Sequence, residues 1–146
     1  MKLFSLTFFM AFISMSAYGQ SFQNIVCKGS GEWKGVTGTV QTYTVNTKVE
    51  SNVMSSTFVI NGLSETLQFR AEFKENGFFD VIIDEGGSPR IIGNGFCHDI
   101  QCIYKASFPT FAIEESLLFV HRKLYRLARR ISSEGAIMIL QDVCIK

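Results

Sequence analysis

The 146-residue sequence lacks the motifs on which most enzyme chemistry depends. It contains no G-x-S-x-G nucleophile turn, no P-loop and no H-E-x-x-H zinc motif. Gly93-Asn94-Gly95 lacks the third glycine and the following helix of a dinucleotide site. The acidic residues mostly alternate onto a polar face, so a pair of catalytic carboxylates is not indicated. We therefore predict that the protein is not an enzyme and has no catalytic residue and no cofactor.

Histidine is scarce, with two residues in the chain, and neither predicts a metal site. His98 and Asp99 lie between Cys97 and Cys102, where a Cys-His-Cys zinc site would need both thiolates free. A disulfide would remove those thiolates, so we expect an ordinary loop there. His121 could ligate a haem iron, but it lies in a basic stretch that we expect to be exposed at a turn.

An excess of charge of one sign is also missing, since 14 basic residues stand against 13 acidic ones. A nearly neutral domain has no overall field to attract nucleic acid or an anionic membrane, so we predict neither partner. The one basic cluster comprises Arg122, Lys123, Arg126, Arg129 and Arg130. We interpret this cluster as solvated surface, with an anion-binding patch as the alternative.

A long apolar run occurs only near the N-terminus. Lys2 is followed by an apolar stretch over Leu3–Ser16, and the small residues Ala17 and Gly19 precede Gln20. This order is typical of a secretory signal peptide and is too short for a membrane span. We therefore predict a signal peptide over 1–19, a single domain over 20–146, and an exported protein that is periplasmic or secreted. An ordinary buried N-terminal helix is the alternative.

The clearest secondary structure lies over 67–83. Apolar and polar residues alternate from Leu67 to Lys74, which is typical of a strand with one buried and one solvated face. Glu75-Asn76-Gly77 then forms a three-residue hairpin loop that ends in glycine. The predicted register sets Phe73 opposite Phe79, Ala71 opposite Val81 and Phe69 opposite Ile83. On the polar face, Arg70 would lie between Asp80 and Asp84.

Further strands are predicted at intervals of about ten residues. They cover Gly38–Glu50, Val53–Ile60, Arg90–Cys97, Cys102–Phe108 and Ala136–Cys144, with a hairpin turn at Asn61-Gly62. The chain is therefore predicted to be all-β, an antiparallel up-and-down β-barrel of 8–10 strands, because closure removes exposed sheet edges. The charges on the second face of Leu67–Lys74 argue against a membrane barrel, so we predict no membrane span.

The segment over 110–131 supports two interpretations. Ile113, Leu117, Val120, Leu124 and Leu127 fall at helical spacing, with acidic residues early and basic residues late, as a helix dipole favours. The polar His121-Arg122-Lys123 between two apolar runs also fits the turn of another hairpin. We favour strands because the neighbouring segments are strands, and a short helix within 110–131 stays open.

All four cysteines lie after the predicted signal peptide, which argues for disulfides in an oxidising compartment. Four cysteines allow three pairings. We favour Cys97–Cys102, which would face each other across a hairpin. We also favour Cys27–Cys144, which would join the first strand to the last in a closed sheet.

Gly31-Glu32-Trp33 follows a lead-in segment over Gln20–Ser30 and stands before or on the first barrel strand. It resembles the Gly-x-Trp signature of lipocalin-like (calycin) proteins. The resemblance implies an up-and-down barrel that holds a small apolar ligand, with the tryptophan at the closed end under an arginine from a late strand. Arg126 and Arg129 are both candidates for that arginine.

The predicted barrel interior is rich in Phe, Met and Tyr, a composition that suits either a ligand pocket or a filled core. We therefore predict a protein that binds or carries a small hydrophobic molecule inside the barrel. The alternative is a protein-interaction or inhibitor module with a filled core and functional loops. The residues predicted to face inward and to contact the ligand are Met54, Leu67, Phe69, Phe73, Phe79, Val81, Ile83 and Tyr104, with Ala71 between them.

Overall fold

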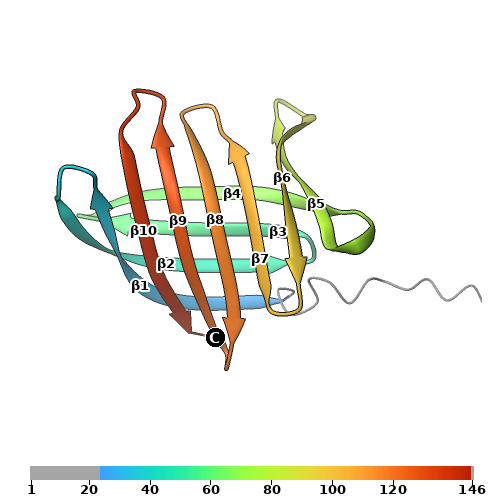
Figure 1. Cartoon of the computed structure of the whole chain (residues 1–146), viewed down its shortest axis with the longest axis horizontal. Coiled ribbons are helices and arrows are strands. Elements are labelled where there is room, and N and C mark those ends of the chain that lie inside the picture. The colour runs from blue at the N-terminus through green and yellow to red at the C-terminus, as the bar shows by residue number, and fades with distance from the viewer. Residues whose placement is uncertain (1–23, 146) are drawn as a thin grey trace, which may run out of the picture.

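The computed structural model describes residues 24–145, which form ten antiparallel strands in one closed barrel (Figure 1). The predicted signal peptide over 1–19 lies outside the described residues. The strands are β1 (Ile25–Gly35), β2 (Val40–Glu50), β3 (Val53–Ile60), β4 (Leu63–Phe73), β5 (Phe78–Glu85), β6 (Ser88–His98), β7 (Gln101–Ser107), β8 (Phe111–Val120), β9 (Lys123–Ser132) and β10 (Ile137–Ile145). Consecutive strands pair with each other, and β1 pairs with β10 to close the sheet. The predicted all-β up-and-down barrel is confirmed.

The described residues contain no α-helix, and their one short helical turn is a 3-10 turn over Glu75–Gly77. A helix long and apolar enough to cross a membrane is accordingly absent from residues 24–145. The first strand begins earlier than predicted, because Ile25 already lies in the barrel wall. Its alternation is hard to detect in the sequence, because Gly29 and Gly31 occupy inward positions and carry no side chain.

The ambiguous segment over 110–131 forms the β8–β9 hairpin, so the strand interpretation is confirmed and the helix alternative is wrong. The turn residues His121 and Arg122 both have positive φ angles, 49° and 64°. Two consecutive residues of this kind make the tight turn that suits the twist of a hairpin. A period of two then directs Leu117 and Leu124 into the barrel, which a helix would not do over this length.

The β4–β5 hairpin has the predicted register at its turn. Phe73 pairs with Phe79 and Ala71 with Val81, and the left-handed conformations of Asn76 and Gly77 reverse the chain between them. On the outer face the predicted charge contacts differ from those observed. Arg70 lies 3.4 Å from Glu72 of its own strand. Asp80 pairs instead with Lys74 at 2.7 Å, because the lysine beside the turn reaches it more directly.

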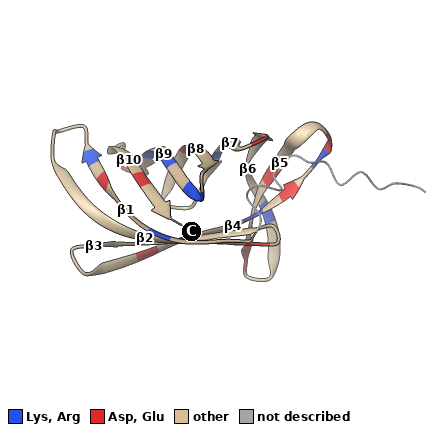
Figure 2. Ribbon diagram, turned by 90° about the horizontal axis from the view of Figure 1, so that it is seen from below, with Lys and Arg blue, Asp and Glu red and all other residues tan. Residues whose placement is uncertain are grey.

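The barrel is flattened, with two walls that cross. Strands β7–β10 run across the front of Figure 1, and β2–β4 run behind them in a different direction (Figures 1 and 2). The inward side chains of both walls meet in one core, in which Ile25, Val81 and Leu124 are at most 1% exposed. Acidic and basic residues are interspersed on strands of both walls (Figure 2).

Both predicted disulfides are confirmed. Cys27–Cys144 joins β1 to β10 at the seam of the barrel, across a sequence separation of 117 residues. Cys97–Cys102 joins β6 to β7 across a hairpin, with a separation of five residues. All four cysteines are at most 4% exposed. Two structural disulfides place the protein in an oxidising compartment.

The two disulfides should contribute unequally to stability. In the chain-entropy model a disulfide raises the free energy of the unfolded chain by reducing its entropy. The increase is about 5 kcal/mol for the seam disulfide, Cys27–Cys144, and about 2 kcal/mol for the hairpin disulfide, Cys97–Cys102. We expect the pair Cys27→Ala and Cys144→Ala to lower the free energy of unfolding by more than the pair Cys97→Ala and Cys102→Ala. Urea unfolding of both variants checks this prediction. Equal losses would show that closure of the seam does not limit the unfolded chain.

Candidate functional site

The residues predicted to line a ligand pocket do face the barrel interior. Met54, Leu67, Phe69, Phe79, Val81 and Tyr104 are buried. Ile83 and Ala71 are half-buried at its margin. Phe73 is 38% exposed, because it stands at the end of the barrel beside the β4–β5 turn. The space beside Gly95 is filled by the ring of Phe79, although Tyr104 is also its strand neighbour.

The interior has little free volume. A cavity of about 50 Å³ lies among Met54, Phe69 and Phe79 at one end of the barrel. A second cavity of about 10 Å³ lies at the other end, beside Phe111 and Arg130. Sites for small organic ligands usually have volumes of about 300–1,000 Å³. These two cavities therefore have room for a few water molecules at most.

A cluster of polar residues occupies the middle of the barrel, and we call it the interior cluster. Its charged members are Arg126 of β9, Glu115 of β8 and Asp142 of β10, all at most 3% exposed. Arg126 Nε lies 3.6 Å from Glu115 Oε1 and 3.5 Å from Asp142 Oδ2. The other members are Tyr43, Thr47, Ser56 and Tyr104. The cluster holds two carboxyl groups for one guanidinium.

Arg126 connects the two walls of the barrel. Its Nη2 donates hydrogen bonds to Thr47 Oγ1 at 2.8 Å and to Ser56 Oγ at 3.0 Å. Thr47 and Ser56 lie on β2 and β3, whereas Arg126 lies on β9 in the opposite wall. The guanidinium also lies 5.1 Å from the centre of the Phe58 ring, within the range of a cation–π contact. One side chain therefore holds both walls at a fixed separation.

Two tyrosines complete the interior cluster. Tyr43 Oη donates to Asp142 Oδ2 at 2.8 Å, and Tyr104 Oη donates to Glu115 Oε2 at 3.1 Å. The other carboxyl oxygens, Glu115 Oε1 and Asp142 Oδ1, make no hydrogen bond, nor do Nε and Nη1 of Arg126. Buried polar atoms without partners are costly, so the protonation of this cluster should influence stability strongly.

Burial decides the protonation of the cluster. Burial raises the pKa of Glu115 and of Asp142 above their ordinary values, although the nearby Arg126 opposes this shift in both. Asp142 raises the pKa of Glu115 further by charge repulsion. Burial alone would lower the pKa of Arg126, but Glu115 and Asp142 outweigh that effect and raise it. Arg126 therefore stays charged, and both carboxyl groups lose their protons at a higher pH than ordinary carboxyl groups do.

Gly31 of the Gly31-Glu32-Trp33 motif has a specific packing role beside this cluster. It pairs with Asp142 across the β1–β10 seam, and an added Cβ would lie 2.5 Å from the Asp142 Cβ. Trp33 Nε1 donates to Met138 Sδ at 2.6 Å. Of the two arginines considered for Trp33, Arg126 contacts Phe58. The other, Arg129, lies on the outer face.

The basic cluster predicted as solvated surface is divided between the two faces of β9. Arg126 is fully buried inside the barrel, so its predicted exposure is wrong. Arg130 is half-buried at the barrel end, where it lies over the Phe111 ring and binds both carboxylate oxygens of Glu65. Arg122, Lys123 and Arg129 are exposed. Arg126 stands between the inward residues Leu124 and Ala128 in the alternating pattern of β9. A charged residue at such a position is the sequence signal that identifies the buried arginine of the basic cluster.

Stability should depend on pH through Glu115. A raised pKa means that the folded chain holds the proton more tightly than the unfolded chain, whose value lies near 4. The resulting stabilisation is complete below about pH 4 and is lost as pH rises through the raised folded value. Glu115→Gln keeps the group neutral, so its free energy of unfolding should exceed that of the wild type increasingly as pH rises from 4. The excess is about 1.4 kcal/mol for each unit of pKa shift.

Urea unfolding of both proteins between pH 4 and pH 8 measures this difference. Glu114→Gln is the matched control, because Glu114 is the preceding residue of β8 but faces solvent. The control should differ from the wild type by less than about 0.5 kcal/mol at every pH. A Glu115→Gln variant that is less stable than the wild type at pH 8 would contradict the assigned protonation.

Replacement of Arg126 should lower the free energy of unfolding strongly. Arg126→Met leaves two buried carboxyl groups without a cation, and breaking a buried ion pair from one side costs about 3–5 kcal/mol. We expect this loss at pH 7 and a smaller loss at pH 4, where both carboxyl groups can be neutral. Arg129→Met is the control, since its exposed contact to Glu114 is 3.9 Å long and worth at most about 1 kcal/mol. Similar losses for the two variants at pH 7 would show that Arg126 is not the connection between the walls.

A depression much larger than the two interior cavities lies on the outer face of the barrel. It is a groove of about 690 Å³ across β5–β10. Exposed apolar side chains line it, among them Phe78 and Leu127, both 55% exposed, and Ile103, 50% exposed. Exposed apolar side chains on neighbouring strands make the groove a candidate interaction site. The sequence does not predict the groove, because its residues are outward-facing positions on six different strands.

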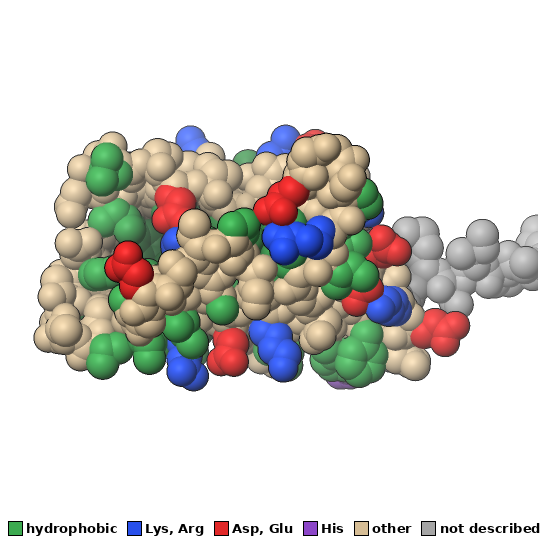
Figure 3. Space-filling view, turned by 90° about the horizontal axis from the view of Figure 1, so that it is seen from above, with side chains coloured by type: hydrophobic (Ala, Val, Ile, Leu, Met, Phe, Trp, Pro, Cys, Tyr) green, Lys and Arg blue, Asp and Glu red, His purple; other side chains and the backbone are tan. Residues whose placement is uncertain are grey.

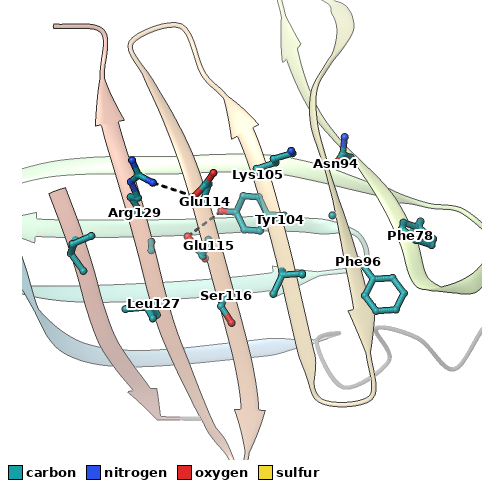
Figure 4. Close-up of a pocket in the computed structure, with 14 residues that line it drawn as sticks. Phe78, Asn94, Phe96, Tyr104, Lys105, Glu114, Glu115, Ser116, Leu127 and Arg129 are labelled. Carbon is teal, nitrogen blue, oxygen red and sulfur yellow. Dashed lines mark hydrogen bonds and ion pairs between the residues drawn. The ribbon is translucent and has the colours of Figure 1, made fainter. Parts of the chain in front are cut away.

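The strand register arranges the groove into two rows that cross the strands (Figure 4). The apolar row consists of Phe78, Phe96, Ile103, Ser116 and Leu127, each paired with the next. The charged row consists of Asn94, Lys105, Glu114 and Arg129, paired in the same way. Basic and acidic side chains alternate along one edge of the molecule in Figure 3 as well.

In comparisons with known proteins, no family model and no curated protein matches the chain. The resemblance to lipocalin-like proteins therefore stays a prediction. Among residues 24–145, no group of three or more His, Cys, Asp and Glu is placed to hold a metal ion. His98 lies 3.3 Å from Asp99, and the neighbouring Cys97 and Cys102 form a disulfide.

Proposed function

We propose that this protein is an exported interaction module, in which a filled barrel presents a docking groove on its outer face. The observation that carries the proposal is the apolar groove across β5–β10. Its apolar row exposes large side chains on neighbouring strands, where a solvated sheet would present polar ones. Aromatic and large aliphatic side chains of this kind form the centre of protein–protein interfaces.

The state of the interior supports this function over transport of a small hydrophobic ligand. A carrier needs an apolar cavity, whereas the middle of this barrel holds the charged Arg126 and two carboxyl groups. An apolar ligand there would have to displace those groups from their partners at a cost of several kcal/mol. The aromatic side chains predicted to contact a ligand, such as Phe69 and Tyr104, instead pack on each other with ring centres 4.9 Å apart.

Export is part of the proposal. The two disulfides require an oxidising compartment, and the predicted signal peptide over 1–19 would deliver the chain there. A rigid barrel suits such a compartment, because closure leaves no sheet edge for unintended pairing. The partner would be another exported or cell-surface protein.

Site-specific photocrosslinking tests the proposal. We expect a photoreactive amino acid at Ser116, in the groove, to crosslink a discrete partner protein in intact cells that express the exported protein. The same amino acid at Ser55, on the outer face of β3 in the opposite wall, is the matched control and should give no such product. Leu127→Lys should abolish the Ser116 crosslink, because it places a charge in the apolar row.

Val59→Lys is the control for Leu127→Lys, since Val59 is also an exposed apolar residue of the outer face, on β3. It should leave the Ser116 crosslink unchanged. Equal crosslinking from Ser116 and Ser55, or a Ser116 product that survives Leu127→Lys, would contradict a docking site in the groove.

A further inference from the structure

We infer that the groove binds one amphipathic α-helix of its partner, which lies along the apolar row and across β5–β9. This inference rests on the proposed function and specifies the element that docks. It also specifies the charges of that element: one flank of the helix carries an acidic, a basic and an acidic residue in successive turns. Each part of the inference follows from the spacing and chemistry of the two rows.

The pairing of the strands in the groove excludes the commonest way of binding an extended segment there. Where they line the groove, β6–β9 are paired with a neighbour on both sides, so the groove offers no row of free backbone groups to which a strand could be added. The stretches that face no partner strand on one side, Leu63–Phe69 of β4 and Ser88–Ile92 of β6, lie outside the groove. A partner must therefore be recognised through outward side chains. In the groove these are the apolar row and the charged row.

The spacing of the apolar row fits a helix better than an extended chain. Each member lies on a different strand, and neighbouring strands are about 4.8 Å apart. A helix that lies along the row presents one side chain per turn, every 5.4 Å. An extended segment presents side chains on one face about 6.8 Å apart and would lose register by about 2 Å at each strand. The five members span about 19 Å, which corresponds to between three and four helical turns.

The charged row determines the flank of the helix. Lys105, Glu114 and Arg129 alternate in sign on three neighbouring strands. When the apolar face of a helix lies on the apolar row, the line of residues next to that face lies beside these three charges. Each turn of the helix then places one residue near one charge. Complementarity then requires an acidic residue near Lys105, a basic residue near Glu114 and an acidic residue near Arg129. The 3.9 Å separation of Arg129 from Glu114 is long, so both groups can gain closer partners.

A notch in the apolar row indicates where the largest side chain of the helix docks. Ser116 is the one small member of the row, and it pairs with Ile103 on one neighbouring strand and with Leu127 on the other. The difference in size makes the row lower between two exposed aliphatic side chains, and Gln101 borders this position, where its Nε2 donates to Ser116 Oγ at 3.3 Å. An aromatic or large aliphatic residue from the middle turn of the helix fits this position, as a central anchor does in other interfaces.

Two synthetic peptides test the inference on the oxidised protein. Each has 18 residues, blocked ends, leucines along one helical stripe and a tryptophan in the middle turn. One carries Glu, Lys, Glu on the adjacent stripe, and the other carries Lys, Glu, Lys. By fluorescence anisotropy at low ionic strength, the first peptide should bind about tenfold more tightly, since three exposed ion pairs contribute about 0.5 kcal/mol each.

Protein variants then connect this preference to the groove. The triple variant Lys105→Glu, Glu114→Lys and Arg129→Glu should prefer the second peptide by a similar factor. Ser116→Trp should weaken both peptides by about tenfold or more because it fills the notch, whereas Ser55→Trp, in the opposite wall, should weaken neither. Equal binding of the two peptides, or a preference that the triple variant does not reverse, would overturn the docked helix.

The crosslinks from Ser116 distinguish this failure from failure of the proposed function. If the peptides fail while the crosslinked partner persists, the groove is a docking site for an element other than a charged helix. A crosslinked product that is a second copy of this chain would likewise overturn the helical partner, because the described residues offer no α-helix. A crosslinked peptide within the partner that is helical and carries the acid–base–acid flank would confirm the inference.

Discussion

The structure depends on one buried guanidinium that reaches from one wall of a flattened barrel to the other. Arg126 projects from β9, meets carboxyl groups from β8 and β10, and donates to hydroxyl groups of β2 and β3. Apolar packing alone is tolerant of small shifts between two walls, whereas a set of directional contacts to one side chain is not. We regard the interior cluster as the element that fixes how the walls face each other.

The interior cluster also explains why particular residue types occur at neighbouring positions. Asp142 needs space at the seam, which Gly31 provides. The Cys27–Cys144 disulfide closes that seam two inward positions away along β1 and one inward position away along β10. The cost of burying three ionisable groups is reduced because Arg126 lies beside both carboxyl groups and because Tyr43 and Tyr104 donate to them. The middle of the barrel is therefore occupied by the groups that connect its two walls.

Much of the fold could be predicted from local pattern. Alternation predicts the β4–β5 hairpin and its register beside the turn, although the ladder ends before the predicted Phe69–Ile83 pair. The even number of cysteines in a closed sheet predicts both disulfides. The segment over 110–131 was harder, because His121 and Arg122 form a tight turn without the glycine that usually marks one. Propensity rules could not anticipate two adjacent residues of that kind in the left-handed region.

The candidate sites were less accessible to prediction, for two different reasons. Glu115, Arg126 and Asp142 each occupy an inward position of a strand, between apolar residues. This signal is weak in the sequence because charged residues are rarely buried. The outer groove could not be found from any single strand. Phe78 and Leu127 each look like an isolated exposed residue, and only the register across the strands between them brings them into one row.

The central claim is that the barrel interior is a filled, charged scaffold and that recognition takes place outside it. The most direct test is a crystal structure of the oxidised protein soaked with a brominated fatty acid, with the bromine located by anomalous scattering. We predict no bromine within the barrel and an Arg126 side chain that still contacts Thr47 and Ser56. Bromine density between Arg126 and Phe69, with those contacts broken, would contradict the account.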